Sequence, residues 1–521
     1  MGNGRMHTGH LTRRQLLKLV AATGATFPWL DPGLSRLALA AGEKRGGTLT
    51  MGVSTDIFAL DPNEINFANN PVFFQVYNYL VKFSTSLRPE PDLAVSWELA
   101  KDAMSAVFRL REGVRTHSGG VFDADALIAN FKRIKDKATG GGLFSRLEDW
   151  TAAERLDART VRFRFAGPRP DYLAMVARWG MIDPAAFATV RNQGGGTGPF
   201  KVQEWVPGDH LTYVKFDQYW EAGVPFVDRI VIRPYTDPQA LENAFRGNTI
   251  DIAHTVQNKD AERLRAAGLQ VIPAPVANEY FVLTVNTQRR PFDNLKVRQA
   301  FQYLVDRESI VKTVLGGFGG ATVQMVAPGS PGYDPKLNDQ YAFNPAKAKE
   351  LLVAGGFARG FKTSILVTGI TPEPPLIAQI IQADLKQIGI DAQINVVDAA
   401  TYYPQYFAGN FDLNLTFLTL ATLDPTDFTI SSAYRLNETN PSWIKVGPPK
   451  EYVDAIQKLN ASFKEEERFA ALRAAVRYLL DQSWTIPIAL RVPTFGVSKA
   501  VKGFAVDPQM IVDLRKVWLD R

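Results

Sequence analysis

The stretch Thr363–Val397, TSILVTGITPEPPLIAQIIQADLKQIGIDAQINVV, carries the clearest fold signal in the sequence. Its first part, Ser364–Val367, is mostly apolar, as in a buried strand, and in Ile390–Val396 apolar residues alternate with polar ones, as in a strand with one covered face. Between them, Pro374–Ile388 has isoleucine and leucine at helical spacing along one face. Strand, helix and strand at this spacing predict a βαβ crossover with parallel strands, and hence an α/β fold.

A smaller unit is predicted nearer the N-terminus. Ala106–Leu110 and Val161–Phe165 alternate in polarity, as half-exposed antiparallel strands do, and Asp123–Ile134 between them is predicted as a helix with Asp123 as its N-cap. Residues 84–195 are therefore expected to form an α+β domain. The glycine-rich run Gly194–Gly198 at its end lacks the GxxxxGK(S/T) pattern of a phosphate-binding loop, so we interpret it as a turn.

Residues 1–40 are interpreted as an export signal. Thr12–Lys18, TRRQLLK, places two arginines before the apolar run Leu19–Leu30, and Ala38–Ala40 is a small-x-small site of the kind that signal peptidase cuts. The paired arginines are typical of a twin-arginine signal, and the apolar run is too short to span a bilayer, which needs about 20 residues. We therefore expect a periplasmic protein that, lacking cysteine, has no lipid anchor.

The composition argues against several kinds of chemistry. Without cysteine there is no disulfide, thiolate metal site or cysteine nucleophile. Removing residues 1–40 lowers the formal net charge from +6 to +2, which gives no electrostatic reason to expect a nucleic-acid partner. His117, His210 and His254 are far apart in the sequence, and neither a GxSxG nor an HExxH motif occurs. We therefore expect a binding protein that is not an enzyme, with no metal or other cofactor held by its side chains.

Ordered sequence blocks run along nearly the whole chain after residue 40. They comprise Asp92–Glu98, Phe108–Val114, Phe122–Ala126, Gly196–Phe200, Asp217–Trp220, Pro291–Asp293, Val297–Ala300 and Asn344–Ala348. Together these blocks resemble the periplasmic solute-binding proteins of ABC importers in the dipeptide, oligopeptide and nickel class, which are the bacterial extracellular solute-binding proteins of family 5.

The resemblance implies a two-lobed, type II periplasmic-binding-protein fold with an extra α+β domain inserted in the N-terminal lobe. Lobe I is expected to be discontinuous, with residues 41–83, 196–272 and 486–521. The inserted domain is expected at residues 84–195, and lobe II at residues 273–485. The implied function is the extracytoplasmic substrate-binding component of an ABC transporter, which captures a peptide or peptide-like solute between the lobes. Its implied partners are the permease and ATPase complex of the inner membrane, and the chain is expected to be a monomer.

The identity of the ligand stays open at this point. A sugar, an opine or a metal chelate is an alternative to a peptide, and a chemosensor receptor or an enzyme on the same scaffold is a further alternative. In peptide-binding members of the family an aspartate pairs with the α-ammonium group of the peptide, and by spacing Ala421 stands at its place here. Leu418 likewise stands where those members carry tryptophan. The usual peptide anchor is therefore expected to be absent.

Asp424 has two interpretations. It could accept an ammonium or hydroxyl group of a ligand, and Asp427 could do the same. The sequence Asp424–Asp427, DPTD, is also typical of a helix start, with an aspartate N-cap, proline at the first helical position and an acid at the third. The helix start is the stronger interpretation.

The other candidate ligand residues lie in the loop after the first strand and among scattered aromatic and charged positions. Tyr402 and Tyr403 follow the second strand of the βαβ unit. Because neighbouring residues on a strand point to opposite faces, we expect at most one of the two to line the cleft. The complete candidate set is Ser54, Asp56, Phe58, Phe144, Tyr402, Tyr403, Leu420, Ala421, Asp424, Asp427, Arg435 and Trp443.

Overall fold

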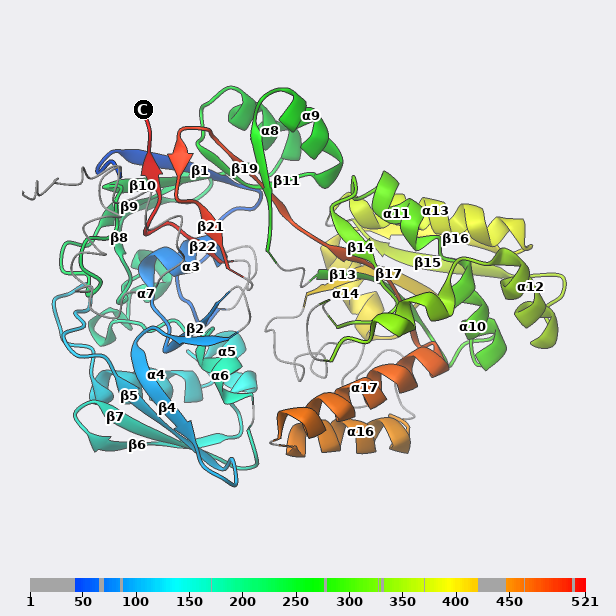
Figure 1. Cartoon of the computed structure of the whole chain (residues 1–521), viewed down its shortest axis with the longest axis horizontal. Helices are drawn as coiled ribbons and strands as arrows, with labels where there is room; N and C mark the ends of the chain where they lie inside the picture. The colour runs from blue at the N-terminus through cyan, green and yellow to red at the C-terminus, as the bar shows by residue number, and fades with distance from the viewer. Residues whose placement is uncertain are drawn as a thin grey trace, which may run out of the picture. The chain divides into compact units, whose positions relative to one another are not determined.

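The computed structural model of the chain describes residues 43–64, 70–84, 88–169, 171–275, 279–326, 328, 332–369, 371–419, 447–462, 464–507 and 511–521. The chain divides into two compact units, Met1–Lys44 and Arg45–Arg521. In the described part of the second unit, three sheets have four or more strands, and helices pack against them (Figure 1).

The first of these sheets has seven strands in the order β12-β19-β11-β1-β10-β9-β8. Its central strand β1 (Thr48–Val53) runs parallel to both neighbours, β10 (Arg229–Pro234) and β11 (Ile252–Val256). The other four strands are antiparallel to their neighbours; they are β8 (Phe200–Val206), β9 (His210–Lys215), β12 (Gln270–Pro273) and β19 (Thr494–Val497). The helices that pack against this sheet are α3 (Asn70–Val76), α7 (Val190–Gln193), α8 (Pro238–Arg246) and α9 (Ala261–Ala266).

The second sheet has six strands in the order β14-β18-β13-β17-β15-β16. Their bounds are Gly319–Ala321 for β14, Thr485–Arg491 for β18, Glu279–Val285 for β13, Leu413–Thr419 for β17, Lys362–Thr368 for β15 and Asp391–Val397 for β16. One face packs on α10 (Leu295–Leu304), α11 (Arg307–Thr313), α12 (Pro345–Ala354) and α13 (Glu373–Gln387). The other face packs on α14 (Ala399–Phe407), α16 (Lys450–Ala461) and α17 (Glu465–Gln482).

The predicted βαβ crossover is confirmed as β15, α13 and β16. The two strands are parallel and in register from Lys362 opposite Asp391 to Thr368 opposite Val397. The helix buries Ile377, Ile381 and Leu385 completely against the sheet, because its apolar residues recur at helical spacing on one side. This face belongs to the largest apolar core among the described residues.

The third sheet has four strands in the order β4-β5-β7-β6, with bounds Ala94–Leu99, Ser105–Leu110, Thr160–Phe165 and Trp150–Asp157. Helix α4 (Ala124–Lys135) packs on it and begins as predicted at Asp123, whose carboxylate accepts the backbone N–H of Ala126 at 3.0 Å. The sheet core is aromatic: Phe163 contacts both Phe108 and Trp150.

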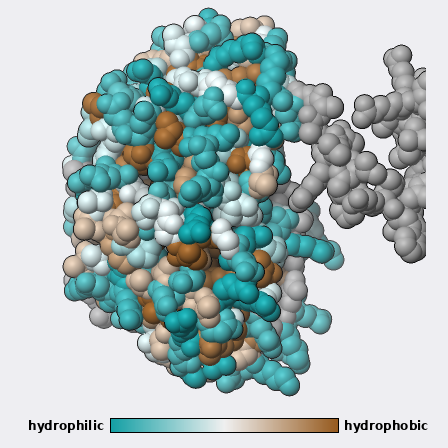
Figure 2. Space-filling model, turned by 90° about the vertical axis from the view of Figure 1, so that its left-hand side faces the viewer, coloured by the Kyte–Doolittle hydropathy of each residue, from teal (hydrophilic) through white to brown (hydrophobic). Residues whose placement is uncertain are grey.

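On the face of the molecule that Figure 2 shows, hydrophilic residues dominate and hydrophobic residues lie in separate groups.

The position at which the chain leaves the second sheet differs from the expected one. We expected the return to lobe I after residue 485, but β18 (Thr485–Arg491) pairs with β13 and β14 in the six-stranded sheet. The chain reaches the seven-stranded sheet only with β19, after the two residues Val492 and Pro493. The sequence could not reveal this, because an apolar run such as Ile486–Leu490 would be equally well buried in either sheet.

Candidate functional site

The carboxyl ends of β1, β10 and β11 lie at one edge of the seven-stranded sheet, because the three strands are parallel. Ligands of open α/β sheets bind outside this edge. Ser54, directly after β1, has its hydroxyl 3.4 Å from that of Thr255 on β11. The carboxylate of Asp56 accepts the backbone N–H of Gly208 at 3.3 Å. Ser54 and Asp56 therefore lie at this edge, and Phe58, 41% exposed, follows them.

The six-stranded sheet has an equivalent edge. Its strand β15 runs parallel to β16 and β17, so their carboxyl ends lie together. Strand β13 begins at this edge with Glu279, whose register partners are Thr419 at the end of β17 and Arg491 at the end of β18. Helix α13 also begins here, with Glu373, because it follows β15 in the crossover.

At this second edge one guanidinium group lies between two carboxylates. Arg491 Nη1 is 2.6 Å from Glu279 Oε2, and Arg491 Nη2 is 3.3 Å from Glu373 Oε1. The side chains are 17% exposed for Arg491 and Glu279 and 8% exposed for Glu373. Burial alone would lower the pKa of Arg491, but the two carboxylates raise it above its ordinary value. We call these three residues the edge triad.

The edge triad is not fully hydrogen-bonded. Glu373 Oε2 and Arg491 Nε are buried and have no hydrogen-bond partner among the residues that the structure describes. Two carboxylates and one guanidinium also leave the triad with a formal excess of one negative charge. Buried polar groups are normally paired, so these unused atoms call for an explanation.

Two chain crossings join the two edges. Strand β12 ends with Pro273 at the carboxyl edge of the seven-stranded sheet, and β13 begins with Glu279 at the carboxyl edge of the other sheet. In the opposite direction, β18 ends at Arg491, and β19 begins at Thr494 opposite Val256, the last residue of β11. The two carboxyl edges therefore lie on either side of the crossings, and we place the candidate site there.

Asn258 fastens the second crossing. Its side-chain amide donates a hydrogen bond to the carbonyl oxygen of Val492 at 2.9 Å, and its Oδ1 accepts one from the hydroxyl of Thr494 at 2.9 Å. The same amide is 3.4 Å from the carbonyl oxygen of Phe318, directly before β14. This buried asparagine thus links the end of β11 to segments on both sides of the crossing.

The two candidate tyrosines lie on a helix and not on a strand, so that part of the interpretation was wrong. Helix α14 is capped by Asp398, whose carboxylate accepts the backbone N–H of Thr401 at 2.8 Å. Tyr402 is 2% exposed and packs into an aromatic cluster on the sheet. Tyr403 is 47% exposed and stacks on Phe407 with 6.0 Å between ring centroids. Only Tyr403 presents its ring to solvent.

Phe144 lies half-buried in the short helix α5 (Gly141–Arg146). This helix is tied to the loop after β1, because the backbone N–H of Gly142 donates to the carbonyl oxygen of Asn63 at 3.0 Å. The remaining candidates lie outside the described residues and stay predictions; they are Leu420, Ala421, Asp424, Asp427, Arg435 and Trp443.

Sequence reasoning missed all three members of the edge triad. Glu279 and Arg491 are 212 residues apart, and no spacing rule connects them. The available signal was weak. Glu279 is the first residue of the apolar strand β13, Arg491 is the last residue of the apolar strand β18, and Glu373 is the first residue of helix α13. Only the register of β13 with β18 brings them together.

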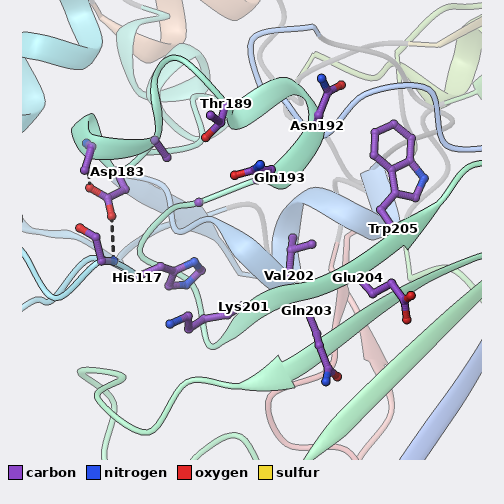
Figure 3. A pocket seen from close by; sticks show the side chains of 15 residues that line it. His117, Asp183, Thr189, Asn192, Gln193, Lys201, Val202, Gln203, Glu204 and Trp205 are labelled. Atoms are coloured by element: carbon purple, nitrogen blue, oxygen red, sulfur yellow. Dashed lines mark hydrogen bonds between the residues drawn. The ribbon is translucent and has the colours of Figure 1, made fainter.

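A pocket of about 510 Å³ lies elsewhere, beside the edge strand β8 (Figure 3). Strand β8 is at the opposite end of the seven-stranded sheet from β12 and β19, which carry the crossings. The pocket is lined by Lys201–Trp205, by α7, by the turn at Gly194 and Gly195, and by His117 and Asp183. The carboxylate of Asp183 accepts the backbone N–H of Ser118 at 2.9 Å. Because β8 is far from the strands that carry the crossings, the pocket is separate from the candidate site.

The buried imidazole in this pocket is fully hydrogen-bonded. His117 Nδ1 accepts the backbone N–H of Gly196 at 3.2 Å, and Nε2 donates to the carbonyl oxygen of Gly198 at 3.0 Å. Burial lowers the pKa of His117 to about 4, so the neutral form persists at physiological pH. The histidine fastens the glycine-rich run as a turn, which is the interpretation we gave it.

Within the described ranges, no group of three or more His, Cys, Asp or Glu side chains is arranged to hold a metal ion. In that same part of the chain, none of the helices is long and apolar enough to cross a membrane.

Comparison with known proteins gives consistent matches. A sequence model described as bacterial extracellular solute-binding proteins, family 5 Middle, matches residues 88–440. The dipeptide-binding protein of Escherichia coli (strain K12) is 26% identical over 471 residues, which is 83% of this chain and 87% of the relative.

Two solved structures share the fold along most of the chain. The periplasmic binding protein AgaA from A. tumefaciens R10, in complex with agropinic acid, is 25% identical, with a TM-score of 0.77 over 91% of this chain and 99% of that chain. The binding protein DppA from Helicobacter pylori, in complex with the peptide STSA, is 24% identical, with a TM-score of 0.77 over 92% and 99% of the two chains. The expected two-lobed α/β architecture of periplasmic binding proteins is thereby confirmed.

Proposed function

We propose that this chain, which belongs to the bacterial extracellular solute-binding proteins of family 5, captures a peptide or peptide-like solute and delivers it to an ABC permease. The observation that carries the proposal is that both crossings run between the carboxyl edges of the two sheets. A ligand held between these edges would contact both lobes at once. It would therefore favour the closed arrangement by binding it more tightly than the open one.

The similar proteins support two classes of ligand. The dipeptide-binding protein of E. coli and the peptide complex of DppA favour a short peptide. An opine-like compound is the second candidate, because AgaA was solved with agropinic acid and because Ala421 replaces the expected anchor aspartate. Both classes combine carboxylate and amino or amide groups.

For the ligand site we propose contacts from each edge. Ser54, Asp56 and Phe58 would contribute from the seven-stranded sheet, and Tyr403 would offer a stacking surface from α14. Tyr402 is no longer among the proposed contacts, because its ring is buried. It packs against the ring of Tyr403, with 5.3 Å between the ring centroids. The candidates between Leu420 and Trp443 stay in the proposal on sequence grounds alone.

For the domain division we propose lobe I as residues 41–83, 196–273 and 494–521, because β12 ends at Pro273 in the seven-stranded sheet, with the inserted domain at residues 84–195 as before. Lobe II would then extend from Glu279 to Arg491, because β13 and β18 pair within the six-stranded sheet. The hinge would comprise the connection between β12 and β13 together with Val492 and Pro493.

We further propose that the chain acts without turnover, as a monomer, with a permease and an ATPase as its partners. Proteins of this family are extracellular, and the twin-arginine signal proposed for residues 1–40 would export this chain in a folded state. The double substitution Arg13→Lys and Arg14→Lys should leave the precursor inside the cell, whereas Lys18→Arg should not. Undiminished periplasmic protein from the double variant would remove the twin-arginine proposal.

Two measurements test the function. Mass spectrometry of ligand released from purified protein should identify a peptide or an opine-like compound. Saturation with that ligand should reduce the radius of gyration in small-angle scattering, and at 100 times its Kd it should add about 2.7 kcal/mol to the free energy of unfolding. An unchanged radius, or steady conversion of the bound compound into product, would contradict a non-catalytic receptor.

A further inference from the structure

We propose that the edge triad is the anchor for a positively charged amino group of the ligand, with Glu373 as the accepting carboxylate. This inference rests on the proposed function and makes it more specific: the solute carries a free ammonium group. It also assigns the anchoring role to a residue far from Ala421 in the sequence.

The charge of the triad is the first argument. Arg491 contacts a carboxylate on each side, at 2.6 Å for Glu279 and 3.3 Å for Glu373, so one negative charge is not neutralised within the triad. Burying an unbalanced charge is unfavourable, and buried charges are normally paired. A ligand cation would supply the missing positive charge, whereas a ligand carboxylate would add a third negative one.

The unused carboxylate oxygen is the second argument. Glu373 is 8% exposed, and its Oε2 accepts no hydrogen bond from the described residues. The other oxygen, Oε1, faces Arg491. An ammonium group has three N–H donors and no acceptor, so it is complementary to a carboxylate with one free oxygen. Such charge-assisted hydrogen bonds are about twice as strong as those between neutral groups.

The location of the triad is the third argument. Glu279 lies directly opposite Thr419, the last residue of β17, in the β-ladder, and the next residue in the sequence is Leu420, a predicted ligand contact. Glu373 begins α13 at the same carboxyl edge, next to the crossing at Arg491. The edge triad therefore lies at the carboxyl edge of the six-stranded sheet, where a solute bound between the lobes would contact this sheet.

A purely structural role makes different predictions. Glu373 is the first residue of α13, and a carboxylate in the first turn of a helix stabilises the helix through its dipole. If that were its whole function, replacing it would change stability and would affect all ligands alike. An anchor for ammonium instead discriminates between a free and a blocked amino group.

The test uses Glu373→Gln and three pairs of probes: alanylalanine, glycylleucine and methionylleucine, each with its N-acetylated form. Affinities are measured by calorimetry on the full mature protein. We expect wild type to prefer the free-amino forms, and Glu373→Gln to weaken their binding roughly 10- to 100-fold while the acetylated forms change less than about threefold. The matched control Glu350→Gln removes an exposed carboxylate of α12 and should leave both series unchanged.

Each other outcome has a definite meaning. An equal loss for both series, or no loss, would overturn the anchor and leave the receptor function intact. Binding of neither series to wild type would contradict peptide binding and the anchor together. If Glu373→Gln does not fold, Glu279→Gln removes the same excess charge from the other side of Arg491 and should produce the same selective loss.

Discussion

Arg307 and Arg491 are both buried near the six-stranded sheet, but their surroundings differ. Arg307 donates to four backbone carbonyl oxygens, those of Thr322, Pro487, Gln302 and Tyr341, and to the side-chain oxygen of Gln302. It forms no ion pair with any described residue. Arg491 instead contacts two carboxylates and keeps one donor unused.

The surroundings have opposite electrostatic effects. Burial lowers the pKa of Arg307 to about 10, because carbonyl dipoles compensate only part of the lost hydration. For Arg491 the two carboxylates outweigh burial and raise the pKa. The region around Arg307 uses its polar atoms internally, as expected of a structural core. The edge triad has an unbalanced charge and unused atoms, as expected of a site that is completed by a partner.

The largest effect is expected from Arg307→Met. It leaves four carbonyl groups and the Gln302 side chain without their donor in a site that is only 6% exposed. The free energy of unfolding, measured by urea denaturation, should fall by roughly 3–5 kcal/mol. The exposed Arg359→Met is the control and should change it by less than about 0.5 kcal/mol. A loss below about 1 kcal/mol for Arg307→Met would mean that this region is not a structural core.

The next effect is expected from Arg491→Met. Without the guanidinium, the carboxylates of Glu279 and Glu373 would be buried with no cation between them, so the free energy of unfolding should fall by about 3 kcal/mol in urea denaturation. A loss below about 1 kcal/mol would contradict the electrostatic coupling of the edge triad and remove the contrast with Arg307.

A smaller effect is expected from His117, which is buried and fully hydrogen-bonded without charge. Because its folded pKa of about 4 lies below the unfolded value of 6.5, its stabilising contribution is complete above pH 6.5 and is lost as the pH falls toward 4. Well below pH 6.5 the free energy of unfolding should fall by about 1.4 kcal/mol per pH unit, and at pH 5.5 the accumulated loss should be about 1.4 kcal/mol.

The variant His117→Gln should remove that slope in urea titrations between pH 7 and 5. His254→Gln is the matched comparison, because burial lowers the pKa of His254 to about 4 as well, while its Nε2 has no partner among the described residues. At pH 8 we therefore expect His117→Gln to be the more destabilising of the two. An unchanged slope in His117→Gln would show that folding does not lower the pKa of this histidine.

The smallest effect is expected from Tyr402→Phe. The hydroxyl of Tyr402 is buried near the polar side chains of Asn414 and Thr416 but makes no hydrogen bond of good geometry with a described residue, so its removal should change the free energy of unfolding by less than about 0.5 kcal/mol, or increase it. Tyr77→Phe is the matched control, because that hydroxyl donates to the carbonyl oxygen of Leu60 at 2.7 Å and its loss should cost about 1 kcal/mol. Equal losses in thermal or urea unfolding would contradict the assignment of Tyr402.

Local patterns in the sequence predicted the parts of the fold that depend on near neighbours. The β15-α13-β16 crossover was recognisable because its strand and helix periodicities are strong and Gly389 separates them. Helix α4 begins at its predicted cap, and this signal is also local: the Asp123 carboxylate accepts the backbone N–H of Ala126, three residues later in the sequence. Helix α14 was missed, because Thr401, Tyr402 and Tyr403 favour a strand and Pro404 suggests a break.

Pairing between distant segments was not predictable. The interpretation of Ile486–Leu490 as part of lobe I was wrong because burial of an apolar run does not identify its neighbours. For the same reason Glu279, Glu373 and Arg491 were not candidates, although Ser54, Asp56 and Phe58 were placed at an edge through the strand that they follow. A single sequence carries no signal for a contact between residues that are 212 positions apart.

The location of β19 also determines when this protein can fold during its synthesis. Residues Thr494–Val497 lie between β11 and β12 in the seven-stranded sheet, although they come from the last part of the chain. Until the ribosome has released them, β11 and β12 each have an unpaired edge, which is a template for aggregation. The seven-stranded sheet is therefore completed only after Thr494–Val497 have left the ribosome, and a nascent chain truncated before Thr494 would be a substrate for chaperones and proteases.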